Sequence, residues 1–313
     1  MRFAFRQEGL EQLMTDSKPH ENLTRLIREK ASTVLDPAGR KVAVIKDNQA
    51  MALAGYFECS LAAVYTPAMD LGIWPYRYIR NRDTLTLEDQ LRLAGSRVAV
   101  IGAGGLGGHL ILVLARLGVG HITVVDPDVF DETNLNRQAL STMSNTGKSK
   151  AAAAVRAAAE INPAVETRSL VCPLNRSTAS GILKSTDVAV DALDSIRDRL
   201  VLQKAAHKYG IPMVHGAIAG FAGQVMTILP GDLGLKHLYG NKTPSKKSAR
   251  RNAESILGVP APTPCLIAGL QAMEVVKLLL NRGRTFRNRL MCVDLESGFF
   301  NEVSFETAGS SKP

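Results

Sequence analysis

The chain has 313 residues and a formal net charge of +9, and 45% of its residues are hydrophobic. This is ordinary globular usage, and no run approaches the roughly 20 uninterrupted apolar residues of a membrane span. The N-terminus lacks the apolar core and cleavage site of a signal peptide, so we expect a cytoplasmic protein without a membrane partner. The positive charge suits nucleic acid, an acidic protein or nucleotide phosphates and does not choose among them.

Residues 1–70 show no sustained periodicity. A helix is expected over Glu21–Ala31 and a short strand over Val42–Ile45. We interpret residues 1–70 as a small N-terminal appendage of unknown role. Leu71–Arg82 is rich in aromatic and cationic residues and reads as a connection, and a helix is expected over Leu87–Ala94.

From residue 96 onward, short apolar runs alternate with longer amphipathic ones. Strands are expected over Val98–Ile101, His121–Val125, Val188–Val190, Pro212–Val214 and Gln224–Leu229, and helices over Leu106–Leu117, Lys148–Ile161 and Arg197–Tyr209. This alternation predicts an α/β fold with a Rossmann-like sheet, whose parallel core is flanked by helices. A helix over Leu266–Leu280 and antiparallel strands over Leu290–Asp294 and Asn301–Phe305 should complete a domain spanning 71–307. A disordered tail, 308–313, should follow.

A glycine-rich loop follows the first of these strands directly. Its glycines, Gly102, Gly104, Gly105 and Gly107, let the backbone approach phosphate while the next helix directs its N-terminal N–H groups at the anion. The loop therefore predicts a nucleotide site. Taken alone, it suits NAD as well as ATP, and glycines can also serve only tight strand–helix packing.

An acidic residue and a polar run follow the second strand. Asp126 lies where a carboxylate accepts hydrogen bonds from ribose hydroxyls. The run Asp126–Gln138 and the later Gly147–Lys150, together with the glycine loop, resemble the HesA/MoeB/ThiF family of ubiquitin-activating-enzyme-like adenylyltransferases. Further matching segments, in the family's order, are Arg77–Arg80, Val190–Ser195, Gly220–Val225 and Gln271–Lys277.

The resemblance implies a specific reaction. The C-terminal carboxylate of a small ubiquitin-like sulfur-carrier protein ending in Gly-Gly attacks the α-phosphate of MgATP, which gives an acyl-adenylate and pyrophosphate. The residue chemistry agrees, because a carboxylate that attacks a polyanion needs cations around the developing charge, and Arg137 and Lys150 are of the right type.

The resemblance also assigns roles to single residues. Asp126 would hold the ribose, Asn134 and Arg137 the phosphates, Lys150 the phosphate chain, and Asp194 the Mg²⁺ beside the α-phosphate. Arg80 matches a residue that reaches the phosphates of a neighbouring subunit, so a homodimer is expected. The catalytic set is then Arg80, Arg137, Lys150 and Asp194, and the nucleotide-binding set contains Gly102, Gly104, Gly105, Gly107, Asp126, Asp128, Asn134, Arg137, Lys150 and Asp194.

Each assignment has a purely structural alternative. Asp126 can cap a turn, Asn134 can order its own loop, Lys150 can decorate an exposed helix, and Asp194 can cap the helix that follows it. His215 lies near the carboxyl edge of the sheet but has no second histidine at a metal-ligand spacing. We interpret it as hydrogen-bonded scaffold.

The cysteines depart from the family pattern. Many relatives bind a structural zinc through two C-x-x-C pairs, whereas Cys59, Cys172, Cys265 and Cys292 are scattered, so no structural zinc is expected. Cys265 starts a helix and is the nearest candidate for a reactive thiol, but we interpret it as a packed residue.

The segment 233–253 carries six Lys or Arg residues and no acidic one. It is expected to be a mobile loop, in the region where the family has a flexible loop over the carrier tail. It can clamp an acidic partner or be merely solvated. Nucleic acid is a less favoured partner, because only Tyr239 interleaves with the charges as a stacking platform would require.

Three other functions compete with carrier adenylation. The same fold can adenylate another carboxylate or a tRNA-linked substrate. An NAD-dependent oxidoreductase would use the same glycine loop, and the Asn134, Arg137 and Lys150 set argues against it. A non-catalytic scaffold would have no need of Arg80 and Asp194.

Overall fold

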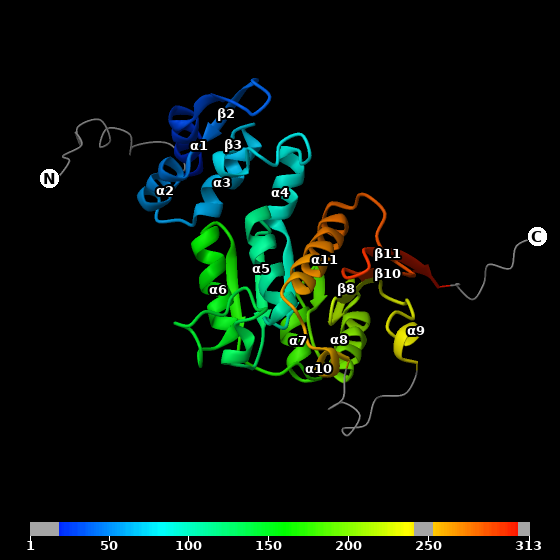
Figure 1. The fold of residues 1–313 in the computed structure, drawn as a ribbon. Helices are drawn as coiled ribbons and strands as arrows, with labels where there is room; N and C mark the ends of the chain where they lie inside the picture. Colours follow the sequence, from blue (N-terminus) through cyan, green and yellow to red (C-terminus); the bar gives the residue numbers. More distant parts are fainter. Residues whose placement is uncertain (1–18, 241–252, 306–313) are drawn as a thin grey trace, which may run out of the picture. The chain divides into compact units, whose positions relative to one another are not determined.

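A computed structural model describes residues 19–240 and 253–305. The chain divides into two compact units, Met1–Leu91 and Arg92–Pro313, and each is described by itself. The division falls after Leu91 rather than after residue 70, where the sequence placed it. Figure 1 shows the secondary structure elements of both units.

The first unit is a small three-stranded sheet with helices. Its helices are α1 (Pro19–Lys30), α2 (Asp47–Tyr56), α3 (Leu61–Asp70) and the 3₁₀-helix η3 (Tyr76–Tyr78), and its strands are β1 (Ser32–Leu35), β2 (Lys41–Ile45) and β3 (Trp74–Pro75). The strand order is β1-β2-β3, with β1 antiparallel and β3 parallel to β2.

The predicted connection Leu71–Arg82 is an integral part of this unit. Trp74 pairs with Val44 of β2, and Trp74 and Tyr78 are buried in a cluster with Val42 and Val44. Large aromatic side chains gain most from burial, and this explains why the segment packs inward. The interpretation of Leu71–Arg82 as a mere connection was therefore wrong.

The second unit is built on one large sheet. Its strands are β4 (Arg97–Ile101), β5 (His121–Val125), β6 (Glu166–Leu170), β7 (Val188–Asp191), β8 (Met213–Ala219), β9 (Ala222–Ile228), β10 (Arg289–Asp294) and β11 (Phe299–Ser304). Its helices are α5 (Gly105–Leu117), α6 (Lys150–Ile161), α7 (Thr178–Leu183), α8 (Ile196–Tyr209), α9 (Lys236–Tyr239), α10 (Ala253–Leu257) and α11 (Pro262–Leu280), with the 3₁₀-helix η4 at Glu132–Asn134. Helix α4 (Leu87–Gly95) spans the division between the units.

The strand order of this eight-stranded sheet is β11-β10-β9-β8-β7-β4-β5-β6. Strands β6, β5, β4, β7 and β8 are parallel neighbours, and β9, β10 and β11 add antiparallel strands at one side. The predicted Rossmann-like sheet with antiparallel C-terminal strands is thereby confirmed. The chain runs outward from β4 to β6 and returns on the other side of β4 as β7, so the carboxyl ends of β4 and β7 form the switch point where ligands bind in such sheets.

Helices cover both faces of the sheet (Figure 1). Helix α5 packs against α6 and α11, and α11 also contacts β8 and β9. Glycines permit this approach: a Cβ added at Gly223 would lie 2.4 Å from the side chain of Ile267. On the opposite face, α7 and α8 enclose a core with Ile101, Ala189 and Met213.

Helix α11 is long and apolar enough to cross a membrane by length and composition alone. It lies against α5 and β8, however, and 56% of its most apolar window is buried inside the protein. These contacts are those of a core helix.

Several elements differ from the sequence-based expectation. Helix α11 begins at Pro262, because prolines are tolerated in a first helical turn, and not at Leu266. Within the expected mobile loop 233–253, Leu235 is buried and the next residues form helix α9, whose Tyr239 packs on the core. This part of the interpretation was therefore wrong. Residues 241–252 and the predicted tail 308–313 lie outside the described residues.

Candidate functional site

The glycine loop after β4 is shaped by two close backbone approaches. Gly102 has φ of +100°, and a Cβ added there would lie 2.5 Å from the carbonyl oxygen of Ala192, which follows β7. A Cβ added at Gly107 would lie 1.8 Å from the carbonyl oxygen of Gly102. These two positions therefore require glycine, and they bring the ends of β4 and β7 together at the switch point.

A pocket of about 430 Å³ opens over this loop, and we call it the polar pocket. It brings together most of the residues singled out in the sequence, namely Gly102, Gly104, Gly105, Asp126, Asp128, Asn134, Arg137, Lys150 and Asp194. Gly107 lies behind its surface, against Gly102. Arg80 belongs to the first unit, where it is exposed.

Asp126 ties the pocket wall to the glycine loop. It follows β5, is 5% exposed, and accepts hydrogen bonds from the N–H groups of Ala103 (2.7 Å) and Asp128 (2.8 Å). Burial raises the pKa of Asp126, although these two N–H donors and Lys150 oppose the shift. Each oxygen keeps lone pairs beyond these bonds, so the carboxylate can hold the loop and still accept from a ligand.

The last residue of η4 presents an amide, and the turn after η4 presents a guanidinium. The buried Asn134 accepts from the N–H of Asp131 at 3.0 Å, so its carbonyl oxygen orders its own loop, as in the structural alternative. Arg137 donates to the carbonyl oxygen of Thr133 and to Asn136 Oδ1, both at 2.9 Å. These are neutral acceptors, which an anion can outcompete for the guanidinium.

Lys150 is a buried cation at the first residue of α6, whose N-cap is Ser149. It is 8% exposed and its Nζ lies 3.3 Å from Asp128 Oδ2. The alternative that it decorates an exposed helix is therefore wrong. A buried ammonium whose one ion-pair partner, within the part of the chain that the structure describes, lies at the edge of hydrogen-bond range is well suited to a second anion.

Asp194 lies beyond β7, immediately before the N-cap Ser195 of α8, and is exposed to the pocket. The cap of α8 is therefore Ser195 and not Asp194. Glu254 of α10 lines the same space, and burial, followed by the charge of Asp194, raises the pKa of Glu254. Among residues 19–240 and 253–305, no group of three or more His, Cys, Asp or Glu side chains is arranged to hold a metal ion.

Gln138 is a pocket residue to which the sequence assigned no role. It is 7% exposed, and its Oε1 is buried without a hydrogen-bond partner among the described residues. An unsatisfied buried acceptor is costly, so its presence in a pocket wall indicates a donor supplied by a ligand. Its place directly after Arg137, in the run used for the family resemblance, was the available signal.

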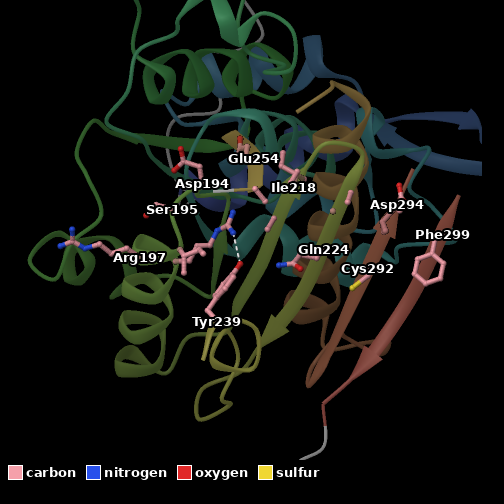
Figure 2. A pocket seen from close by; sticks show the side chains of 18 residues that line it. Asp194, Ser195, Arg197, Ile218, Gln224, Tyr239, Glu254, Cys292, Asp294 and Phe299 are labelled. Carbon is pink, nitrogen blue, oxygen red and sulfur yellow. Dashed lines mark hydrogen bonds between the residues drawn. The ribbon is translucent and has the colours of Figure 1, made fainter. Parts of the chain in front are cut away.

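A second pocket of about 680 Å³ adjoins the first, and we call it the apolar pocket (Figure 2). Its floor is formed by β8, β9, β10 and β11 and includes Ala217, Ala219, Ala222 and Phe299. This pocket could not be predicted from sequence, because small residues on neighbouring strands line a common surface only once the strands are paired. Four residues line both pockets: Asp194, Arg199, Ile218 and Glu254.

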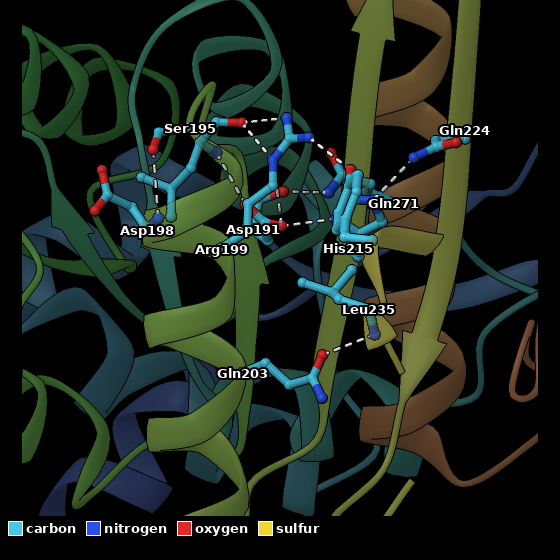
Figure 3. Close-up of polar contacts among 11 residues, drawn as sticks. Asp191, Ser195, Asp198, Arg199, Gln203, His215, Gln224, Leu235 and Gln271 are labelled. Atoms are coloured by element: carbon cyan, nitrogen blue, oxygen red, sulfur yellow. Dashed lines mark hydrogen bonds and ion pairs between the residues drawn. The ribbon is translucent and has the colours of Figure 1, made fainter. Parts of the chain in front are cut away.

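A buried polar network supports the junction of the two pockets (Figure 3). Asp191 lies 2.7 Å from the ring of His215 and 3.8 Å from the guanidinium of Arg199. Arg199 also donates to the carbonyl oxygen of Leu193 and to Tyr239 Oη. His215 is thus hydrogen-bonded scaffold, as predicted, and the network fixes the start of α8 beneath Asp194.

Together these features define a nucleotide-binding enzyme with a Rossmann-like fold. The pocket combines a glycine cradle at a switch point, a carboxylate after the second strand, and two cations for phosphates. The chain belongs to the ThiF family, whose model matches residues 78–312.

Relatives support the same class. The chain is 35% identical over 233 residues to the SAMP-activating enzyme E1 of Haloferax volcanii, covering 74% of this chain and 85% of that protein. It is 35% identical over 219 residues to the sulfur carrier protein adenylyltransferase of Thermus thermophilus, covering 68% and 80%. It spans about half the length of several other curated relatives. Like the relatives that carry this name, the chain is an adenylyltransferase.

Solved structures agree on the fold. The crystal structure of E. coli MccB with ATP superposes with a TM-score of 0.63 at 20% identity, covering 75% of this chain and 72% of that one. At this identity the likeness concerns the fold alone.

Proposed function

We propose that this protein adenylates the C-terminal glycine carboxylate of a small ubiquitin-like sulfur-carrier protein, using MgATP. The names of the Haloferax and Thermus relatives support a carrier protein as the substrate. The observation that carries the proposal is the junction of the two pockets at Asp194. A reaction that joins a carboxylate to a nucleotide requires adjoining sites of this kind.

In the proposed step, a carboxylate oxygen of the carrier attacks the α-phosphorus of ATP. A new C–O–P linkage forms while the bond between the α-phosphorus and the bridging oxygen breaks, and pyrophosphate leaves with that electron pair. No proton needs to move. Arg137 and Lys150 offset the repulsion between the two anions and the charge that develops on the phosphates.

The polar pocket also suits the nucleoside. Asp126 and the unpartnered Oε1 of Gln138 are acceptors in its wall, and ribose hydroxyls are donors. Asn134 completes the set on the same turn as Arg137. Gly104 and Gly105 leave the backbone open, since a Cβ added at either would meet its nearest neighbour only at 3.5 Å.

Magnesium would enter with the nucleotide. Mg²⁺ is usually bound by one or two carboxylates plus substrate phosphates, so a single exposed Asp194 fits this ion even without a cluster of ligands. Bound there, the ion supplies charge neutralisation on the phosphate oxygens.

We further propose a homodimer in the cytoplasm in which Arg80 of one subunit reaches the phosphates bound by the other. Arg80 is exposed, and among the described residues no hydrogen bond or ion pair involves its side chain. An arginine supplied in trans can stabilise the charge on transferring phosphates, and an unpartnered guanidinium is available for this role.

A second candidate substrate is a different carboxylate. The apolar pocket, at about 680 Å³, lies within the range of small-molecule sites, so a small apolar acid or a peptide tail with apolar side chains is the alternative acyl substrate. A tRNA-linked carboxylate is the third member of this class.

Carboxylate-dependent exchange of pyrophosphate into ATP tests the proposal. We expect exchange with a carrier ending in Gly-Gly, and loss of about two orders of magnitude in Asp194→Ala. Glu160→Ala, at an exposed position on α6 outside both pockets, is the matched control and should exchange normally. If Asp194→Ala leaves the exchange intact, the site assignment is wrong. Exchange that occurs only with small acids would favour the second candidate substrate. Tight binding of NADH without binding of ATP would overturn the proposed function.

A further inference from the structure

The residues on both sides of Arg80 make side-chain hydrogen bonds and ion pairs with other residues of the first unit. On the N-terminal side of Arg80, Arg77 is clamped by the carboxylate of Asp47, at the start of α2. Arg77 Nε donates to Asp47 Oδ1 at 3.3 Å, and the guanidinium makes a second, ion-paired bond to Oδ2. Tyr65 Oη of α3 donates to the same carboxylate at 2.6 Å.

The neighbours of Arg77 are fixed as well. Lys46 Nζ lies 5.9 Å from the centre of the Tyr76 ring. Tyr78 is 4% exposed, and its ring meets that of Tyr65 edge to face at 6.3 Å. Lys46, Asp47 and Tyr65 therefore each contact one of the three residues of η3.

The C-terminal side of the turn is held by a second set of bonds. Asn81 donates to Gln90 at 3.2 Å. Arg82 pairs with Asp36, which also accepts from Arg40 Nε at 2.8 Å, and Asp36 is 5% exposed. A buried carboxylate that joins two guanidiniums of different elements is a rigid anchor.

Arg80 stands between these two anchored segments without a partner of its own among the described residues. Arg77 and Tyr78 before it and Asn81 and Arg82 after it all make side-chain contacts, so the long Arg80 side chain extends from a fixed turn and is available to a ligand. The backbone reinforces this, because the N–H of Asn81 donates to the carbonyl oxygen of Tyr78 at 2.8 Å.

We propose that the N-terminal unit is a holder for Arg80, with Asp47 as the main positioning residue and Asp36 as the second. This inference rests on the proposed function, in which Arg80 meets the phosphates. It gives residues 19–76 a role in the reaction without any contact with substrate. Positioning matters because a displacement of about 1 Å can cost two orders of magnitude in rate.

The test is a double-mutant cycle on the exchange rate in the full chain. Asp47→Ala should lower kcat at least tenfold, and the double variant with Arg80→Ala should be no slower than Arg80→Ala alone, because the holder has nothing left to place. Binding of adenosine, which has no phosphates, should be unchanged. Tyr65→Phe keeps the ring and removes one bond to Asp47, so it should show a smaller loss of the same pattern and remains informative if Asp47→Ala misfolds.

Glu29→Ala is the matched control, since it breaks the exposed pair between Arg25 and Glu29 on α1 in the same unit, away from the turn. It should leave kcat unchanged. An Asp47→Ala rate equal to wild type, or losses that multiply in the double variant, would overturn the holder while leaving adenylation intact. Absence of any exchange in the wild-type chain would instead overturn the proposed function.

Discussion

The Nδ1 atom of His215 lies 2.7 Å from Asp191 Oδ2, with both side chains fully buried beneath the junction of the two pockets. The Nε2 atom of the same ring lies 3.3 Å from Nε2 of Gln224, which can only donate. The ring must therefore accept at Nε2 and donate from Nδ1 to Asp191, so the neutral tautomer satisfies both contacts.

This arrangement predicts a pH dependence of stability. Burial lowers the pKa of His215 below 6.5, although its bond to Asp191 opposes the shift. The imidazole of His215 binds a proton more tightly in the unfolded chain than in the folded one. The stability that the neutral ring contributes is therefore fully present above pH 6.5 and is lost as the pH falls below this value. For His215 the free energy of unfolding should fall with a slope approaching 1.4 kcal/mol per pH unit, that is, about one proton.

Urea unfolding of wild type and His215→Asn at pH 7.5, 6.5 and 5.5 measures this slope. Burial also lowers the pKa values of His109 and His207, so the variant should lose part of the slope and retain the rest. Identical slopes in the two proteins would contradict a neutral His215.

The glycine loop predicts opposite outcomes for two neighbouring glycines. Gly107→Ala places a Cβ 1.8 Å from the carbonyl oxygen of Gly102 and should destabilise the fold by about 3 kcal/mol. Gly105→Ala meets only Pro264 at 3.5 Å and lies at the start of α5, so it should change stability by less than about 1 kcal/mol. Thermal unfolding of both variants checks the contrast, and equal stabilities would refute the packing argument.

Two buried glutamines should respond in opposite ways to replacement by methionine. Gln138 has an unpartnered Oε1, so Gln138→Met should not lower stability without ATP but should weaken ATP binding about tenfold. Gln203 accepts from the N–H of Leu235 at 2.8 Å and lines neither pocket. Gln203→Met should therefore lower stability by about 1–3 kcal/mol and leave ATP binding unchanged. Calorimetric titration with ATP and urea unfolding separate the two, and a Gln138→Met protein with normal ATP affinity would remove that residue from the site.

A shared site predicts complementation between two variants that are each strongly impaired. Arg80→Ala keeps an intact polar pocket, and Lys150→Met keeps an intact Arg80. After subunit exchange in an equal mixture, about a quarter of the wild-type exchange rate should return, because half of the dimers are mixed and each has one complete site. A mixture as inactive as its components would show that Arg80 acts within its own chain or not at all.

The sheet and the phosphate loop could be predicted from the sequence because their signals are local. The apolar run Val98–Ile101 ends in glycines, and strand, turn and helix follow within a few residues. Strand β6, Glu166–Leu170, was missed, because it is an edge strand in which polar residues are mostly exposed, so it carries no apolar run. The first turn of helix α11 contains Pro262 and Pro264, which give no local helix signal, so the predicted start at Leu266 falls four residues after the observed start at Pro262.

The candidate site was predicted in part. Asp126 and Arg137 lie in the connection between β5 and α6, Lys150 begins α6, and Asp194 lies between β7 and α8. Their meeting in one pocket follows from the strand order, which the sequence only implied. The contact between Asp47 and Arg77 was beyond sequence reasoning, because 30 residues separate them and Asp47 lies outside every segment that matched the family. A side chain that acts through another residue has no fixed sequence distance from it, so no motif reveals the pair.

Intact mass spectrometry of a carrier protein tests the central claim most directly. The carrier, ending in Gly-Gly, is incubated with this protein, ATP and Mg²⁺, beside a carrier that lacks the terminal glycine. We predict that the intact carrier gains the mass of AMP less one water while pyrophosphate is released, that the truncated carrier does not, and that Asp194→Ala abolishes the product. Two results would contradict the account. One is the release of pyrophosphate with a competent carrier but with neither an AMP adduct nor exchange of pyrophosphate into ATP. The other is an AMP adduct that forms equally well with Asp194→Ala.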